Sequence, residues 1–303
     1  MLICPACRSS LDGSHCAACG ITYPVEDRIA DFSRGRYYDS FDPGQTLTDE
    51  HNAGLALELD GTRRRIDDFY GPLIRRFQPD ARRVLDCGCG NGLAVDLLSD
   101  HGYEAWGNDL SQLRKWQWRQ REMRERLVVA DGSSLPFPDG FFDVVIASGV
   151  IEHIGVEELG VPHYTVRPKP TRDLERAGFA LELLRVTRKG GHIFIDCPNG
   201  AFPIDFWHGD AAGGARRHSR DEGFLPAPSE IRALFAGHDV EFLSPYRRLQ
   251  FGQASRHWYG RVLGPPVGLF FRLMRLPLIK RLAASPLNPF LVAKVESSAC
   301  TGS

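Results

Sequence analysis

The sequence has 303 residues, 43% of them hydrophobic and 25% charged, which is an ordinary globular composition with room for one large domain and a small appendage. The net charge of −1 conceals an asymmetry. From Phe242 onward there are nine Lys or Arg residues and one acidic residue, so this region carries +8 and the preceding one −9. A basic region of this kind favours an anionic partner.

The sequence shows no signal-peptide pattern, because Cys4 and Cys7 interrupt the only short apolar stretch at the N-terminus. The longest charge-free run of the basic region, Leu282 to Ala293, has 12 residues, whereas a membrane-spanning helix needs about 20 apolar residues. We therefore expect a cytoplasmic chain without a transmembrane helix.

Four of the eight cysteines lie within the first 19 residues, as two C-x-x-C pairs. The loop between the pairs lets one fold back on the other, so that Cys4, Cys7, Cys16 and Cys19 can close a tetrahedral zinc site. A segment of about 30 residues cannot fold by apolar burial alone, and metal binding supplies the missing free energy. The alternative is a redox C-x-x-C pair, which the presence of two pairs disfavours. We predict a zinc ribbon over residues 1–32.

Residues 33–60 mix Gly, Pro, Asp and aromatic residues without periodicity, so we expect a linker there. Apolar residues then recur at helical spacing from Thr62 to Phe77, which predicts an amphipathic helix. A short apolar strand follows and runs into the glycine turn at residues 88–92, the pattern of a nucleotide-binding α/β unit. Glycines allow a ligand to approach the backbone closely, and Asp86 before them can face a ligand ammonium group.

Three further strands follow this unit, each ending in polar or small residues. The second strand of the series ends at Asp109, 19 residues after Gly90, where such folds bind ribose hydroxyl groups. The third ends at Asp131 and the fourth at Ser148. A fifth strand is expected after a helix and a Gly-Gly pair. We predict an α/β fold for residues 61–241, with a doubly wound, mostly parallel, Rossmann-like sheet.

Residues 62–200 resemble class I S-adenosylmethionine-dependent methyltransferases of the small-molecule type, such as the ubiquinone-biosynthesis families. The motifs that carry the resemblance are VLDCGCGNG at 84–92, GNDLS at 107–111, ADG at 130–132, LPF at 135–137, FDVV at 142–145, EHI at 152–154 and RKGG at 188–191. Residues 3–32 likewise resemble Trm112-like zinc ribbons, with Arg28 where that pattern usually has glycine.

The resemblance implies S-adenosylmethionine as the cofactor. The residues implied are Asp86, Gly88, Gly90, Asn91 and Gly92 for its methionine part, Asp109 with Leu110 for the ribose, Asp131 with Gly132 for the adenine, and Ser148 beside the sulfonium. The rival is an NAD-dependent dehydrogenase, whose turn reads G-x-G-x-x-G. Here position 93 is Leu, so the turn reads G-x-G-x-G and NAD is disfavoured.

Two histidines, His153 and His208, are candidate catalytic bases, because an imidazole titrates near neutral pH and an acceptor hydroxyl needs a base. The alternative for each is a structural role, which is the commoner one for the position of His153 in the resembling families. The segment between Gly155 and Ala180 looks too irregular for a core element, so we expect a loop that shapes an acceptor pocket or extends into solvent.

Residues 242–303 are expected to form a basic, apolar extension, preceded by a helix from Pro228 that Ser229 would cap. Within it, residues 256–292 interleave bulky apolar residues with Arg and Lys, as in an interfacial helix on anionic lipid. The alternative, favoured because Pro277 interrupts the pattern, is a helix packed on the catalytic core or on a dimer partner.

The function expected is methyl transfer to a small acceptor, hydrophobic or carrier-linked, on oxygen or carbon. A ribosomal RNA base methyltransferase with an N-terminal ribbon and a non-catalytic S-adenosylmethionine-binding adaptor are the alternatives. RNA is disfavoured, because the basic region is confined to the C-terminal part and aromatic stacking signals are sparse.

Overall fold

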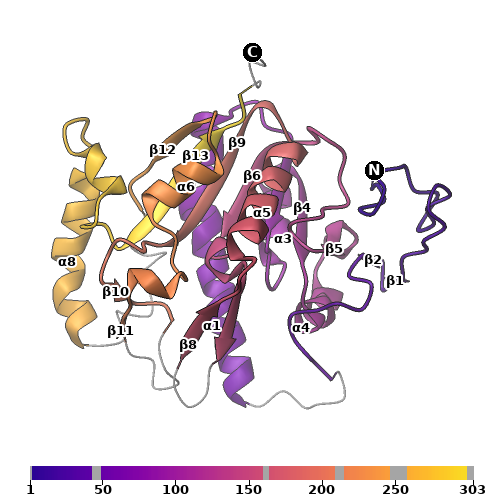
Figure 1. The fold of residues 1–303 in the computed structure, drawn as a ribbon, viewed down its shortest axis with the longest axis horizontal. Coiled ribbons are helices and arrows are strands. Elements are labelled where there is room, and N and C mark those ends of the chain that lie inside the picture. Colours follow the sequence, from indigo (N-terminus) through magenta and orange to yellow (C-terminus); the bar gives the residue numbers. More distant parts are fainter. Residues whose placement is uncertain (1, 43–48, 160–163, 209–214, 246–257, 299–303) are drawn as a thin grey trace. The chain divides into compact units, whose positions relative to one another are not determined.

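The computed structural model describes residues 2–42, 49–159, 164–208, 215–245 and 258–298 (Figure 1). The chain forms two compact units. The first comprises Met1–Ile146 and Leu181–His192, and the second comprises Ala147–Ala180 and Ile193–Ser303.

The first unit contains a six-stranded run of sheet in the order β1-β2-β5-β4-β3-β6 (Figure 1). The strands are β1 (Val25–Glu26), β2 (Ile29–Asp31), β3 (Arg83–Cys87), β4 (Glu104–Asp109), β5 (Leu127–Val129) and β6 (Phe142–Ser148). All neighbouring pairs are parallel except β1 with β2. The chain order runs outward from β3 through β4 to β5 and then returns to β6 on the other side of β3. This reversal beside β3 is the switch point of a doubly wound sheet, where ligands bind at the carboxyl ends of the strands.

The helices of the first unit follow the predicted alternation with the strands. They are α1 (Asp49–Arg65), a π-helical segment (Ile66–Tyr70), α2 (Gly71–Phe77), α3 (Leu93–Asp100) and α4 (Gln112–Gln117), with short 3-10 turns at Trp118–Gln120 and Arg124–Arg126. The predicted helix up to Phe77 is confirmed, but helical structure begins at Asp49, inside the segment expected as a linker.

The N-terminal ribbon joins this sheet directly. Its strand β2 pairs in parallel with β5, with Ala30 opposite Val128, so the ribbon adds its strands to the edge of the sheet (Figure 1). Asp31 at the end of β2 is buried and accepts hydrogen bonds from Lys115 Nζ at 2.8 Å and Tyr37 Oη at 2.6 Å. Burial would raise the pKa of Asp31, but Lys115 and the hydroxyl donors lower it below its ordinary value. The ribbon is therefore tied to α4 as well as to β5.

The second unit contains a three-stranded run of sheet and two separate antiparallel strand pairs. Its strands are β7 (Val156–Leu159), β8 (Thr165–Pro168), β9 (Thr187–Pro198), β10 (Ile204–Asp205), β11 (Arg216–Arg217), β12 (Asp239–Phe242) and β13 (Phe290–Glu296). The helices are α5 (Arg172–Val186), α6 (Pro228–Leu234) and α8 (Trp258–Leu273), with 3-10 turns at Ile151–His153, Arg220–Glu222 and Lys280–Ala284. β13 lies between β9 and β12 and pairs antiparallel with β12. The elements β6, α5 and β9 each run from one unit into the other.

Several sequence expectations for the second unit need correction. The segment after Gly155 is not irregular, because β7 and β8 form an antiparallel hairpin. The fifth strand of the predicted series is β9. It begins at Thr187, so the Gly-Gly pair lies within this strand and not before it. The region expected as a C-terminal extension includes β13, a buried strand of the sheet.

The cap of α6 also differs. Its N-cap is Ala227, without a side-chain hydrogen bond, and Pro228 occupies the first turn. Proline is favoured at this position because its missing N–H has no partner there in any helix. The expectation that Ser229 caps the helix was therefore wrong. Among the described residues, no helix has the length and apolar character needed to cross a bilayer.

The packing around β4 yields a stability prediction. A Cβ on Gly107 would lie 2.8 Å from Cys89 Sγ and 2.8 Å from Val95 Cγ2, closer than van der Waals contact. Gly107→Ala should destabilise the protein by about 1–3 kcal/mol through overpacking. The matched control is Gly61→Ala in α1, where a Cβ meets nothing within 4 Å. Alanine should stabilise this helical position by up to about 1 kcal/mol. Thermal denaturation of both variants checks this, and equal melting temperatures would contradict it.

Candidate functional site

The glycine turn at residues 88–92 joins β3 to α3 and is held against β4. The backbone N–H groups of Gly88 and Cys89 both donate to the Asn108 carbonyl oxygen, at 2.9 Å each. The three glycines of the turn have φ angles between 52° and 78°, a region that residues with a Cβ rarely adopt. The turn thus brings the backbone at the end of β3 close to the end of β4.

Asp109, the last residue of β4, is bound to this turn. Its Oδ2 accepts a hydrogen bond from Gly90 N at 3.0 Å, and its Oδ1 accepts one from Leu110 N at 2.8 Å. Burial raises the pKa of the Asp109 carboxyl, although the Gly90 N–H and the Arg114 guanidinium oppose that effect. The structure therefore brings together a glycine turn and a carboxylate that the sequence placed at the ends of two different strands.

Asp86, in β3, offers a buried carboxylate at the same edge. Its Oδ2 accepts a hydrogen bond from Arg65 Nη2 at 2.8 Å. Its Oδ1 is buried and has no hydrogen-bond donor among the described residues. Burial raises the pKa of Asp86, and Arg65 opposes this. A buried oxygen without a donor suits an N–H group of a ligand, because buried acceptors are rarely left unsatisfied.

Two residues of this site, Glu58 and Arg65, were not predicted, and both lie on α1. Glu58 accepts hydrogen bonds from Asn91 Nδ2 at 3.0 Å and from Arg114 Nη1 at 2.9 Å, so it lies over the glycine turn. Residue 58 fell within the expected linker. The signal that could have revealed it is the run LALEL at 55–59, which consists of strong helix formers.

Asp131 and Leu110 line a cavity of about 110 Å³, which the N-terminal ribbon completes with Pro5, Ala6 and Tyr23. Asp131 itself is exposed, and its Oδ1 accepts two hydrogen bonds from Ser133, at 2.9 Å from N and 2.7 Å from Oγ. Gly132 follows it at the end of β5. Asp131, expected to contact the adenine, and Leu110, expected to contact the ribose, therefore share one cavity with the ribbon.

Ser148 lies in the second unit, at the end of β6. Its hydroxyl donates to Asp196 Oδ1 at 3.0 Å, and the next N–H, that of Gly149, donates to the Asp196 carbonyl oxygen at 2.9 Å. The expected position of Ser148 beside a sulfonium stays a prediction.

His153 and His208 are far apart in the sequence, but they lie together in the second unit, with ring centroids 5.2 Å apart. His153 Nδ1 is 2.5 Å from Glu158 Oε1, and His208 Nδ1 is 3.1 Å from Asp205 Oδ2. Burial alone would lower the pKa of His153, but the hydrogen bond to Glu158 and nearby carboxylate charge raise it above its ordinary value. Each imidazole is thus oriented by a carboxylate, which leaves Nε2 available for chemistry.

The four N-terminal cysteines also converge. Cys4 Sγ is 3.6 Å from Cys19 Sγ, and Cys7 Sγ is 3.4 Å from Cys16 Sγ. All four sulfur atoms lie within 4.8 Å of one another. Thiolates bound tetrahedrally to zinc at about 2.3 Å stand about 3.8 Å apart, so the arrangement fits the ion closely. The two C-x-x-C pairs also share the same backbone hydrogen bond. Arg8 N donates to the Cys4 carbonyl oxygen at 2.7 Å, and Gly20 N donates to the Cys16 carbonyl oxygen at 2.8 Å.

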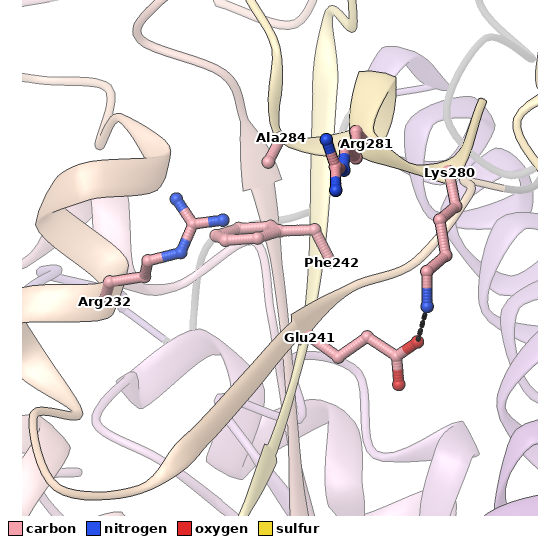
Figure 2. A pocket seen from close by; sticks show the side chains of 6 residues that line it. All are labelled: Arg232, Glu241, Phe242, Lys280, Arg281 and Ala284. Atoms are coloured by element: carbon pink, nitrogen blue, oxygen red, sulfur yellow. Dashed lines mark ion pairs between the residues drawn. The ribbon is translucent and has the colours of Figure 1, made fainter. Parts of the chain in front are cut away.

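A cationic pocket of about 470 Å³ lies in the second unit between β12 and the 3-10 turn at Lys280–Ala284 (Figure 2). Arg232 stacks on the ring of Phe242 at 4.8 Å, and Lys280 reaches Glu241 at 3.9 Å. Arg281 also lines the pocket. The sequence predicted a basic C-terminal region but not this pocket, because Arg232 comes from α6, outside that region.

Residues 85–195 match a family model described as a methyltransferase domain. A probable S-adenosylmethionine-dependent methyltransferase of Mycolicibacterium smegmatis is 30% identical over 136 residues, 45% of this chain and 45% of its own. The 2-methyl-6-phytyl-1,4-hydroquinone methyltransferase of Synechocystis sp. is 31% identical over 137 residues, 43% of this chain and 37% of its own. The 18S rRNA (guanine-N(7))-methyltransferase of Bos taurus is 37% identical over 70 residues, 23% of this chain and 25% of its own.

Residues 85–195 are therefore similar to methyltransferase domains, and the doubly wound sheet agrees with this similarity. The chain spans between a quarter and 60% of the length of the curated relatives it matches.

Proposed function

We propose that the whole protein binds S-adenosylmethionine at the carboxyl edge of the first unit's sheet and transfers its methyl group to a small acceptor. The observation that carries the proposal is the hydrogen bond from Gly90 N to Asp109 Oδ2, because it holds the glycine turn against the carboxylate that we propose binds the ribose. The buried, donor-free Oδ1 of Asp86 supports a ligand ammonium nearby.

The cofactor contacts proposed are those implied by the sequence. The turn residues Gly88, Gly90, Asn91 and Gly92 with Asp86 would hold the methionine part, Asp109 and Leu110 the ribose, Asp131 and Gly132 the adenine, and Ser148 the region of the sulfonium. When bound, S-adenosylmethionine supplies an activated methyl group. The protein's task is then to hold the acceptor atom in line with the methyl–sulfur bond.

An acceptor hydroxyl would also have to lose its proton. We assign this step to His153 or His208, since each presents Nε2 from a ring that a carboxylate orients. Glu158 and Asp205 would stabilise the imidazolium that forms, in the way that a carboxylate supports a general base.

The acceptor class rests on indirect support. The relatives include one named for a hydroquinone and one named for a ribosomal RNA guanine, so their names support a small-molecule acceptor and an RNA acceptor alike. A small acceptor, methylated on oxygen or carbon, agrees better with the histidine pair than RNA does. Salt-dependent RNA binding would favour the ribosomal alternative. A chain that binds S-adenosylmethionine but transfers nothing would be an adaptor.

The proposal is tested by titration calorimetry with S-adenosylmethionine, followed by transfer of labelled methyl groups. Asp109→Ala should weaken cofactor binding at least about tenfold, because the carboxylate loses its ribose contacts and no longer holds the turn. The control is Asp100→Ala, an exposed carboxylate at the end of α3, which should bind as the wild type does.

In the transfer step, label from the wild-type chain should enter the solvent-extractable small molecules of a cell extract. His153→Ala and His208→Ala should reduce transfer while leaving cofactor affinity unchanged. Label found only in RNA would replace the small acceptor with the ribosomal one. No cofactor binding by the wild type would refute the enzyme altogether.

We also propose that Cys4, Cys7, Cys16 and Cys19 bind a structural zinc ion. The ribbon is small and depends on this site for its own folding, so Cys7→Ser should abolish zinc binding and lower the melting temperature by at least about 5 °C. Cys197→Ala, which changes a buried cysteine of the second unit, should keep one zinc ion per chain. Elemental analysis of the purified chains measures this, and a zinc-free wild type with the same melting temperature would contradict it.

The C-terminal segment at residues 256–292 is proposed to contact anionic lipid, which would agree with a hydrophobic acceptor. Helix α8 buries Phe271 within the second unit, as a packed helix would, but exposes Leu269 and Val262, with basic residues close by in the sequence. The packed helix without lipid contact is the alternative. It would be supported if the chain stayed in solution with vesicles.

Leu269 is 57% exposed, and Leu181 in α5 is 64% exposed, so the two make a matched pair. Leu269→Glu should release the protein from sedimenting phosphatidylglycerol vesicles, whereas Leu181→Glu should leave it bound. A wild-type chain that does not sediment with these vesicles would exclude the lipid contact.

A further inference from the structure

A group of three potential ligands in the second unit is not explained by the cofactor site. Glu152, His153 and His208 each offer one ligating atom, and these atoms lie within 4.8 Å of one another. The first two come from the 3-10 turn at Ile151–His153, directly after β6, and His208 follows β10. We propose that these three residues bind a divalent transition-metal ion, of the kind that imidazole and carboxylate ligands prefer.

The two imidazoles are oriented as metal ligands are. Nδ1 of His153 is hydrogen-bonded to Glu158, and Nδ1 of His208 to Asp205, so Nε2 remains as the ligating atom of each ring. Metal-bound histidines typically donate their other ring N–H to a carboxylate, which fixes the ring and makes the ligating nitrogen more basic. Tyr164 Oη in turn donates to Glu158 Oε2 at 2.6 Å and holds that carboxylate in place.

Glu152 supplies an independent indication of a missing ligand. The residue is 1% exposed, and its Oε2 is buried without a hydrogen-bond partner in the described part of the chain. A buried carboxylate with no donor is costly, because burial removes its hydration and nothing replaces it. A cation at this oxygen would remove that cost.

The charges around the group favour a cation as well. Three carboxylates surround the two rings, those of Glu152, Glu158 and Asp205. Arg216 lies near them and contacts Asp205 at 3.2 Å, but its Nη1 also pairs with Glu222 at 2.6 Å. Arg176 pairs with Glu230 at 2.6 Å. Arg216 and Arg176 thus each have a carboxylate partner outside the group, although Arg172 also contacts Glu230, at 2.6 Å.

The aromatic ring of Phe224 covers one side of the group. The ring centroid of Phe224 lies 4.7 Å from that of His208 and 5.7 Å from that of His153, and Phe224 itself is buried. Electrostatic attraction between a cation and its ligands is stronger in such an apolar setting than in water. The apolar contact with Phe224 would therefore strengthen binding.

Closing the site takes only a small movement. Ligands about 2.1 Å from an ion in tetrahedral geometry are about 3.4 Å apart, so the three atoms, which lie within 4.8 Å of one another, need to approach by at most about 1.4 Å. Three protein ligands leave a coordination position open to water or to an oxygen of another molecule, which is the pattern of catalytic sites and not of structural ones. In this respect the site differs from the ribbon, where four thiolates would fill all four coordination positions of a zinc ion.

The cation site rests on its own geometry and does not depend on the proposed methyl transfer. With an ion bound, Nε2 of each histidine would carry metal and no longer accept a proton. The base assigned above would then be replaced by a coordinated hydroxide or acceptor oxygen, because a metal ion lowers the pKa of a bound hydroxyl group.

The test uses the full chain without an affinity tag and with zinc already loaded into the ribbon. Titration calorimetry with Ni²⁺ should show one further ion bound per wild-type chain. Glu152→Gln and His208→Ala should each weaken this binding at least about tenfold, as expected for loss of a ligand. His238→Ala, a histidine of the same unit outside the group, should bind Ni²⁺ as the wild type does.

Two results would overturn the proposal: no ion bound beyond the ribbon zinc, or Ni²⁺ binding that neither variant weakens. Circular dichroism checks that the variants are folded. Should both fail to fold, electron paramagnetic resonance of the wild type with one equivalent of Cu²⁺ decides the question. Nitrogen splitting from two imidazoles is expected, and a spectrum without it would refute the site.

Discussion

The first unit depends on a constraint of parallel strands: their carboxyl ends meet at one edge, and the backbone there must find partners. The Gly90 N–H satisfies that need by donating to Asp109, while the N–H groups of Gly88 and Cys89 share the Asn108 carbonyl. The turn after β3 is therefore fixed to the end of β4 before any ligand binds. A site that is already organised loses less conformational entropy when it takes up a cofactor. The same hydrogen bonds thus serve both the fold and the candidate site.

The charged residues of α1 add a second layer to this edge. Glu58 contacts Asn91 and Arg114, and Arg65 pairs with Asp86, so one helix reaches both ends of the glycine turn. The Arg65 pair is buried, and buried pairs gain little net stability because of desolvation. We interpret this pair as orienting the Asp86 carboxylate, since it leaves the buried Oδ1 without a hydrogen-bond donor among the described residues.

Local patterns predicted much of this molecule. The strands β3 to β6, the glycine turn and the cysteine knuckles are short-range features, and the sequence located each of them. What it missed depends on contacts between distant residues. The first part of α1 has no clear apolar stripe, and β13 becomes a strand by pairing with β9 and with β12, of which the nearer in sequence, β12, lies about 50 residues earlier. The pairing of His153 with His208 likewise arises from tertiary folding, and spacing along the chain carries no trace of it.

The parallel pairing of β2 with β5 gives the ribbon a protective role besides any part in binding. A chain that lacked these N-terminal residues would leave the backbone N–H and C=O groups of β5 uncovered on one side. Open strand edges of this sort invite association between molecules. Loss of the proposed zinc ion would then have the same consequence as cutting the ribbon away, so that solubility would depend on the supply of the ion.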